Sequence, residues 1–169
     1  MIDQLSSLSE KWEEDHPLNP SKNGVKKDNK EEDDEDQDTI EVEKRNETYS
    51  QQLKTISDLM GEMFDGDNLA KFVKHLGNDI AAVRSAPTAL FSFLKAQKPV
   101  EGFCESNAFQ RTLELAMSFG GDSDTIMSMA GAIAGAYYGE SNIPSYLMSI
   151  CEGVEDAKNQ ADAIFKLLQ

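Results

Sequence analysis

The chain has 169 residues, which is about the length of one domain. It holds 31 acidic and 16 basic side chains, and its formal net charge of −15 argues against binding nucleic acid or an anionic membrane surface. No apolar run reaches the ~20 residues that span a bilayer, no secretory signal is present, and two cysteines are too few for a disulfide framework. We therefore expect an intracellular protein of the nucleus, cytoplasm or mitochondrion.

The N-terminal part of the chain divides into two segments. Residues 1–12 place four apolar side chains at helical spacing, which predicts a short amphipathic helix: Ile2, Leu5, Leu8 and Trp12. Residues 13–47 are acidic and almost free of aliphatic side chains, so they cannot bury enough apolar surface to offset the entropy of ordering. We predict a disordered insert, and a tract that binds basic partners is the alternative.

Residues 48–169 have a helical pattern nearly throughout and form the helical C-terminal part of the chain. No stretch shows the period of two that is typical of strands, so the predicted fold class is all-α. The expected apolar faces and ends are Leu53, Ile56, Leu59 and Met63; Leu69 to Leu76, ending at Gly77; a helix starting near Ser85 and Pro87; Ala108 to Phe119, with Leu113, Ala116 and Met117 on one face; Asp124 to Tyr138, ending at Gly139; and Ser145 to Leu168, with a break near Gly153.

Glycines recur every four residues in one predicted helix, at Gly131, Gly135 and Gly139, with alanines between them. Each glycine inside a helix costs up to ~1 kcal/mol relative to alanine. The pattern is explained if another helix packs nearly backbone to backbone along this stripe, which predicts a central position for the helix.

The feature most suggestive of chemistry lies directly before that helix, in the segment SFGGDSDT from Ser118 to Thr125. Asp122 and Asp124 are separated by one residue, and a diglycine permits a sharp bend before them. Two carboxylates and a threonine hydroxyl suit a hard cation such as Mg²⁺ or Ca²⁺. Asp and Thr at this place also cap helices, and spacing alone leaves both interpretations open.

Two other acidic loops are excluded. An EF-hand starting at Asp122 requires Gly at position 127 and Glu at position 133, where this sequence has Met127 and Ile133. A haloacid-dehalogenase-type phosphotransferase places its Asp-x-Asp at the end of a buried strand, whereas the residues before Asp122 have a helical pattern.

The longer segment GGDSDTIMSMAGAIAGAYYG, from Gly120 to Gly139, closely resembles the C-terminal metal motif of the ADP-ribosylglycohydrolase family, and its details look most like the serine-specific branch. Further stretches resemble the same branch: YSQQLKTI from Tyr49, GNDIAA from Gly77, SAPTA from Ser85, QRTL from Gln110 and CEGVE from Cys151. The resemblance covers residues 48–169 and extends in part to the first helix.

The resemblance implies an all-α fold with two Mg²⁺ ions. It also implies a hydrolase that removes ADP-ribose from protein serine and cleaves related O-linked ADP-ribose, including poly-ADP-ribose. The implied metal ligands are Asp122, Asp124 and Thr125, with Asp124 bridging both ions. Asp79 and Ile80 match a stretch beside the bound ADP-ribose, although the family tends to have a small residue at the position of Asp79. The implied partners are ADP-ribose and ADP-ribosylated proteins, with no nucleic acid or membrane, and the full-length protein is expected to be a monomer.

The same resemblance implies a second half of the site. In the family, an N-terminal half supplies a Thr-Asp-Asp ligand set, the catalytic acidic residue and a Gly-rich phosphate loop, and this sequence contains none of them. We therefore expect a C-terminal half that is inactive alone. The alternative is a non-catalytic binding or regulatory fragment that pairs with a partner chain.

Overall fold

The computed structural model describes residues 7, 10–11, 14, 48–104 and 106–168. These residues form helices and no strand, which confirms the all-α prediction. The helices are α2 Tyr49–Met60, α3 Leu69–Leu76, α4 Ala82–Lys95, α5 Ala108–Ser118, α6 Ser123–Tyr138, the 3₁₀ turn η1 Glu140–Asn142, α7 Ser145–Ile150 and α8 Val154–Leu167. The predicted disordered insert of residues 13–47, apart from Glu14, and the apolar residues of the predicted first helix lie outside the described residues.

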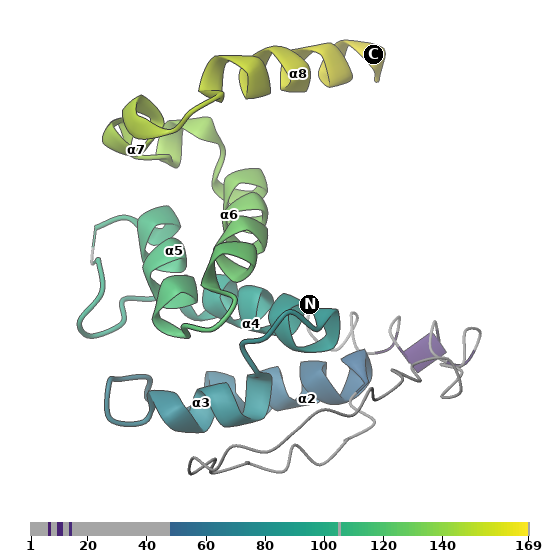
Figure 1. The fold of residues 1–169 in the computed structure, drawn as a ribbon, viewed down its shortest axis with the longest axis vertical. Coiled ribbons are helices and arrows are strands. Elements are labelled where there is room, and N and C mark those ends of the chain that lie inside the picture. The colour runs from purple at the N-terminus through teal and green to yellow at the C-terminus, as the bar shows by residue number, and fades with distance from the viewer. Residues whose placement is uncertain (1–6, 8–9, 12–13, 15–47, 105, 169) are drawn as a thin grey trace, which may run out of the picture.

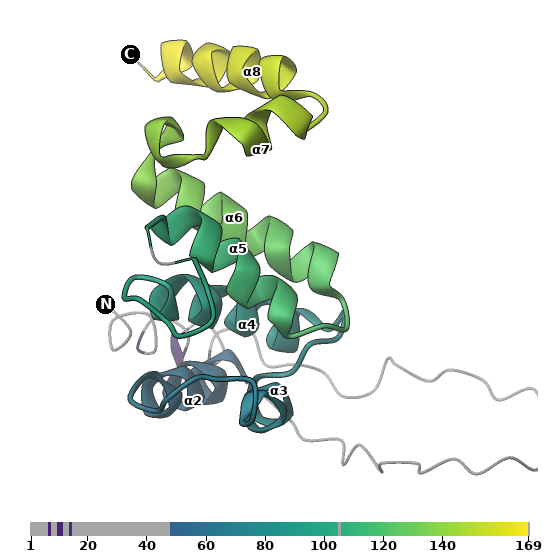
Figure 2. The same ribbon diagram turned by 90° about the vertical axis from the view of Figure 1, so that its left-hand side faces the viewer.

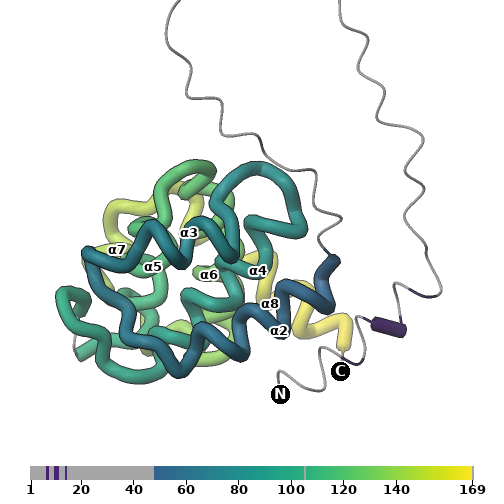
Figure 3. The backbone as a smooth tube through the Cα atoms, turned by 90° about the horizontal axis from the view of Figure 1, so that it is seen from below, coloured from purple at the N-terminus to yellow at the C-terminus, as the bar shows by residue number. Residues whose placement is uncertain are grey.

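The helices stack in layers along the longest axis of the molecule (Figures 1 and 2). α2 and α3 form the base and lie in front when the molecule is seen from below (Figure 3). α4 lies above them, and α5 and α6 stand side by side on α4. α7 and α8 lie beyond the C-terminal end of α6, so the chain ends far from the base.

Four phenylalanines from different elements meet in the core: Phe64, Phe72, Phe91 and Phe119. The ring centroids of Phe64 and Phe72 lie 4.8 Å apart, and those of Phe64 and Phe119 lie 5.7 Å apart. Offset and edge-to-face aromatic pairs add stability beyond the area that they bury. Because Phe119 directly precedes the diglycine, this core holds the entrance to the acidic loop.

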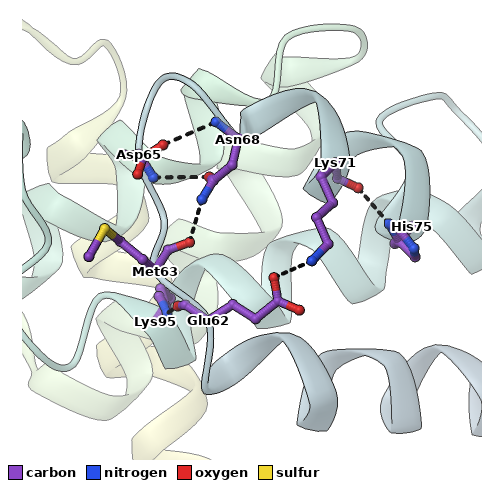
Figure 4. A network of polar contacts seen from close by, with 7 residues as sticks. All are labelled: Glu62, Met63, Asp65, Asn68, Lys71, His75 and Lys95. Atoms are coloured by element: carbon purple, nitrogen blue, oxygen red, sulfur yellow. Dashed lines mark hydrogen bonds and ion pairs between the residues drawn. The ribbon is translucent and has the colours of Figure 1, made fainter.

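Polar contacts fix the turn between α2 and α3 (Figure 4). The Asn68 side chain accepts a hydrogen bond from the Asp65 N–H and donates to the Met63 carbonyl, while the Asp65 carboxylate accepts from the Asn68 N–H. The Lys95 ammonium group donates to the carbonyls of Met60 and Glu62 at the end of α2. The prediction that Met63 lies on a buried face is wrong, because α2 ends at Met60 and leaves Met63 71% exposed.

α4 begins earlier than the sequence predicted. It starts at Ala82, so Pro87 lies inside the helix rather than in its first turn. The carboxylate of Asp79 accepts a hydrogen bond from the Ala81 N–H and thereby satisfies a backbone donor at the helix start. A side chain two residues before Ala81 therefore sets the start of α4, where the expected signal was Ser85 with Pro87.

α5 covers Gly131 and Gly135 of α6 with side chains, whereas a Cβ at Gly139 would meet nothing within 4 Å. A Cβ at Gly131 would lie 3.2 Å from Leu113 Cδ2, and one at Gly135 would lie 3.9 Å from Phe109 Cε2. The predicted backbone-to-backbone contact is therefore wrong, although α6 does pack against both α4 and α5. Met117 was expected on the buried face of α5 but is 54% exposed.

The predicted break near Gly153 is confirmed, since Gly153 has φ +76° and separates α7 from α8. No residue of α8 is buried. Large apolar side chains of α8 lie at the surface, namely Ile164, Phe165 and Leu167. α8 therefore contributes little to the core that the other helices share.

Candidate metal and ADP-ribose site

The acidic loop is a two-glycine bend between α5 and α6. α5 ends at its C-cap Phe119, and α6 begins after its N-cap Asp122. Gly120 and Gly121 have φ values of +63° and +59°, in the left-handed region that only glycine enters at little cost. The diglycine therefore reverses the chain within two residues and places Asp122, Asp124 and Thr125 on the first turn of α6.

The Asp122 carboxylate makes no capping hydrogen bond to the backbone of α6. It accepts a hydrogen bond of 2.9 Å from the Thr125 hydroxyl instead. The pKa of Asp124 lies below its ordinary value, because a hydrogen bond with the Asp122 carboxyl group and the backbone N–H groups of Thr125 and Asp124 favour the charged form. The three predicted ligands therefore lie together at the start of α6.

The chemistry of this donor set fits a hard cation. Two adjacent carboxylates supply negative oxygen ligands, and the Thr125 hydroxyl keeps lone pairs free while its proton is donated to Asp122. Three protein oxygens fill half of the octahedral shell of Mg²⁺. Within the described part of the chain, no three His, Cys, Asp or Glu side chains gather closely enough to hold a metal ion by themselves.

A second loop lies directly against the acidic loop. Residues 77–81 connect α3 to α4, and the carbonyl of Asn78 accepts a hydrogen bond of 2.8 Å from the Asp122 N–H. The Asn78 side-chain amide donates to the carbonyl of Phe119, also at 2.8 Å. The structure therefore brings Asp79 and Ile80, which follow Asn78, into the neighbourhood of the acidic loop.

Asp79 and Ile80 have different environments within this loop. The Asp79 carboxylate is tied to α4, through the Ala81 N–H and through an ion pair of 2.8 Å with the Arg84 guanidinium group. Ile80 is 86% exposed, which is unusual for a large aliphatic side chain. The Asp79 carboxylate is therefore held by contacts with Ala81 and Arg84, whereas the Ile80 side chain is exposed to solvent.

Asn78 is a residue that sequence reasoning missed. Its two contacts join residues 41 and 44 positions apart in the chain, and nothing in the local spacing indicates them. The available sequence signal for this contact was the presence of glycines in both loops: Gly77 directly before Asn78, and Gly120 and Gly121 in the acidic loop. Glycines mark places where two backbones approach closely. A Cβ at Gly121 would lie 2.1 Å from the Asn78 carbonyl oxygen.

A groove of about 560 Å³ lies elsewhere, between α7 and α8. Its lining includes Met148, Cys151, Val154, Asp156 and Lys158. It lies beyond the C-terminal end of α6, whereas the acidic loop precedes the N-terminal end (Figure 1). The groove is therefore separate from the predicted site.

Comparison with known proteins identifies the family to which the chain belongs. The sequence pattern of the ADP-ribosylglycohydrolase family matches residues 23–169, and the chain belongs to this family. Proteins named ADP-ribosylhydrolase ARH3 from Bos taurus and Homo sapiens are each 42% identical over 124 residues, which are 72% of this chain and 33% of each relative. The protein of the same name from Xenopus tropicalis is 38% identical over 131 residues, which are 77% of this chain and 37% of that relative.

The chain thus spans about a third of the length of the curated relatives that it matches. Among the helices that the structure describes, none combines the length and apolar character needed to cross a membrane.

Proposed function

We propose that this chain carries part of the metal centre of a Mg²⁺-dependent hydrolase that removes ADP-ribose from serine side chains of proteins. Related O-linked ADP-ribose, including poly-ADP-ribose, belongs to the same substrate class. The observation that supports the proposal is the pairing of the two loops, since the hydrogen bond from the Asp122 N–H to the Asn78 carbonyl joins the acidic loop to the loop that carries the exposed Ile80.

In this proposal, Asp122, Asp124 and Thr125 bind the cation. The negative charge of the two carboxylates attracts it, and the hydrogen bond from Thr125 to Asp122 fixes the relative orientation of two of the three ligands. Bound Mg²⁺ supplies Lewis-acid polarisation of the scissile linkage and of a water molecule. Ile80 supplies an apolar contact for a ring of ADP-ribose, and Asp79 holds its loop against Arg84.

The remaining Mg²⁺ ligands come from water, from the substrate and from protein segments beyond these two loops, because three oxygens complete only half of the shell. Two ions, as the family resemblance implies, require still more ligands. The proposal therefore predicts weak cation binding by the 169-residue chain alone. Hydrolysis is predicted where the rest of the family domain is also present.

A binding experiment tests the metal site. Isothermal titration with Mg²⁺ is compared for the wild type, Asp124→Asn and the control Asp162→Asn, which changes an exposed carboxylate on α8. We expect Asp124→Asn to abolish the weak Mg²⁺ binding of the chain, because the substitution removes the charge of one of only three protein ligands, and we expect Asp162→Asn to bind like the wild type. Equal affinity of all three proteins would contradict the assignment.

A chimera tests the activity. Residues 48–169 replace the matched segment of the bovine relative, and release of ADP-ribose from a serine-modified peptide is measured with Mg²⁺ and with a chelator. We expect Mg²⁺-dependent release that Asp124→Asn abolishes. A chimera that folds, binds Mg²⁺ and releases no ADP-ribose would favour a non-catalytic binding function for this segment.

A further inference from the structure

Asn78 joins the two loops of the candidate site at both ends of the diglycine bend. Its side-chain amide donates to the carbonyl of Phe119, the last residue before the bend. Its own carbonyl accepts from the N–H of Asp122, the first residue after the bend. Both hydrogen bonds measure 2.8 Å. One residue therefore anchors both sides of a segment whose two internal residues are glycines.

The bend needs such an anchor because of its composition. Glycine has the largest conformational freedom of any residue, so Gly120 and Gly121 do not determine the direction in which α6 leaves α5. The closeness of Gly121 to Asn78 leaves no room for a Cβ. The contact with Asn78 therefore selects the direction of the Asp122–Thr125 segment.

The residues on both sides of Asn78 are held by hydrogen bonds and an ion pair. The hydroxyl of the fully buried Thr88 on α4 donates to the carbonyl of Gly77, the residue before Asn78, at 2.7 Å. On the other side of Asn78, the Asp79 carboxylate is held by Ala81 and Arg84. The loop of residues 77–81 thus follows α4, and Asn78 transmits the position of α4 to the acidic loop.

We propose that Asn78 is a positioning residue whose side-chain amide fixes the Asp122–Thr125 segment in the orientation that binds the cation. The effect on the cation rests on the proposed function of this segment, whereas the effect on backbone order does not. Neighbours that orient metal ligands commonly change metal affinity by about 10-fold to 100-fold when they are removed.

The test uses the full chain with Asn78→Ala and Asn78→Asp. The second variant keeps the shape of the side chain but replaces the N–H₂ group that donates to Phe119 with an acceptor. Asn107→Ala is the matched control. Asn107 also donates its side-chain amide to a backbone carbonyl of another element, that of Asn142, at 2.9 Å, and it lies at the opposite end of α5.

Thermal unfolding first compares the stability lost by each variant, and two readouts are then measured on each protein: Mg²⁺ affinity by titration, and residue-resolved hydrogen exchange at the Asp122 amide. We expect both Asn78 variants to bind Mg²⁺ about 10-fold more weakly and to exchange the Asp122 amide faster. We expect Asn107→Ala to lose a comparable amount of thermal stability while both readouts stay at the wild-type level.

The outcomes separate this inference from the proposed function. If the wild type binds Mg²⁺ and the Asn78 variants bind it equally well, the positioning role is overturned and the metal site stands. If the wild type binds no Mg²⁺, the proposed function fails. Hydrogen exchange at the Asp122 amide then tests whether Asn78 orders the acidic loop. Faster exchange in both Asn78 variants supports the positioning role, and unchanged exchange overturns it.

Discussion

The two glycines of the bend offer a sharp test of the packing between the loops, because they share a backbone conformation but differ in surroundings. Gly121→Ala would place a Cβ 2.1 Å from the Asn78 carbonyl oxygen, which is a backbone atom that cannot rotate away. Gly120→Ala has nothing within 4 Å of the new Cβ. Both residues have positive φ, so both substitutions carry the same conformational strain.

The expected magnitudes follow from these contacts. A left-handed conformation costs a non-glycine residue about 1–2 kcal/mol, and this is the whole cost expected at Gly120. At Gly121 the loops must also separate, which breaks the hydrogen bond from Asp122 to Asn78 and raises the total to about 3 kcal/mol. For a chain of this size, these costs correspond to decreases of Tm of about 4 °C and about 10 °C.

Thermal and urea unfolding followed by far-ultraviolet circular dichroism measure both variants. The free energy of unfolding of Gly121→Ala is expected to fall at least about 1 kcal/mol further than that of Gly120→Ala. Mg²⁺ affinity, measured in parallel, is expected to fall more for Gly121→Ala as well. Equal destabilisation by the two substitutions would show that the loops do not contact as described, and the reasoning would be refuted.

Two further substitutions and one deletion test the core, a buried hydrogen bond and the C-terminal helix. Phe72→Ala removes a fully buried ring and is expected to lower the free energy of unfolding by about 3–5 kcal/mol in urea denaturation. Thr88→Val keeps the volume but leaves the Gly77 carbonyl without its donor, with an expected cost of about 1–3 kcal/mol, and an unchanged midpoint would argue against that bond. Deletion of residues 153–169 removes α8, which has no buried residue, and is expected to shift Tm by only about 2 °C; a much larger decrease would mean that α8 packs on the core.

The sequence by itself determined most helix ends and the family to which the chain belongs. The spacing of Leu69, Phe72, Val73 and Leu76 predicted α3, and glycines after the helices marked the ends of α3 and α6. These features depend on residues within one or two helical turns of each other. They can therefore be predicted without knowledge of distant parts of the chain.

Two local predictions of helix ends failed because polar side chains outside each helix bind backbone groups at its ends. Met63 continues the apolar spacing of α2, yet the helix ends at Met60, where Lys95 of α4 binds the terminal carbonyls. Pro87 is typical of a helix start, yet α4 begins at Ala82. The residue before it, Ala81, donates its backbone N–H to the Asp79 carboxylate. Helix propensity is a weak guide where tertiary contacts supply the missing hydrogen bonds.

Only the tertiary structure decided how the two site loops meet. Asp122, Asp124 and Thr125 are recognisable as a motif, but the contact of their loop with the loop that carries Ile80 depends on the Asn78 hydrogen bonds, which join residues some 40 positions apart in sequence. Those hydrogen bonds form because α3, α4 and α5 pack around a shared aromatic core that ends at Phe119. Helical periodicity records which face of a helix is buried, whereas the partner of that face is set by the packing of the whole domain.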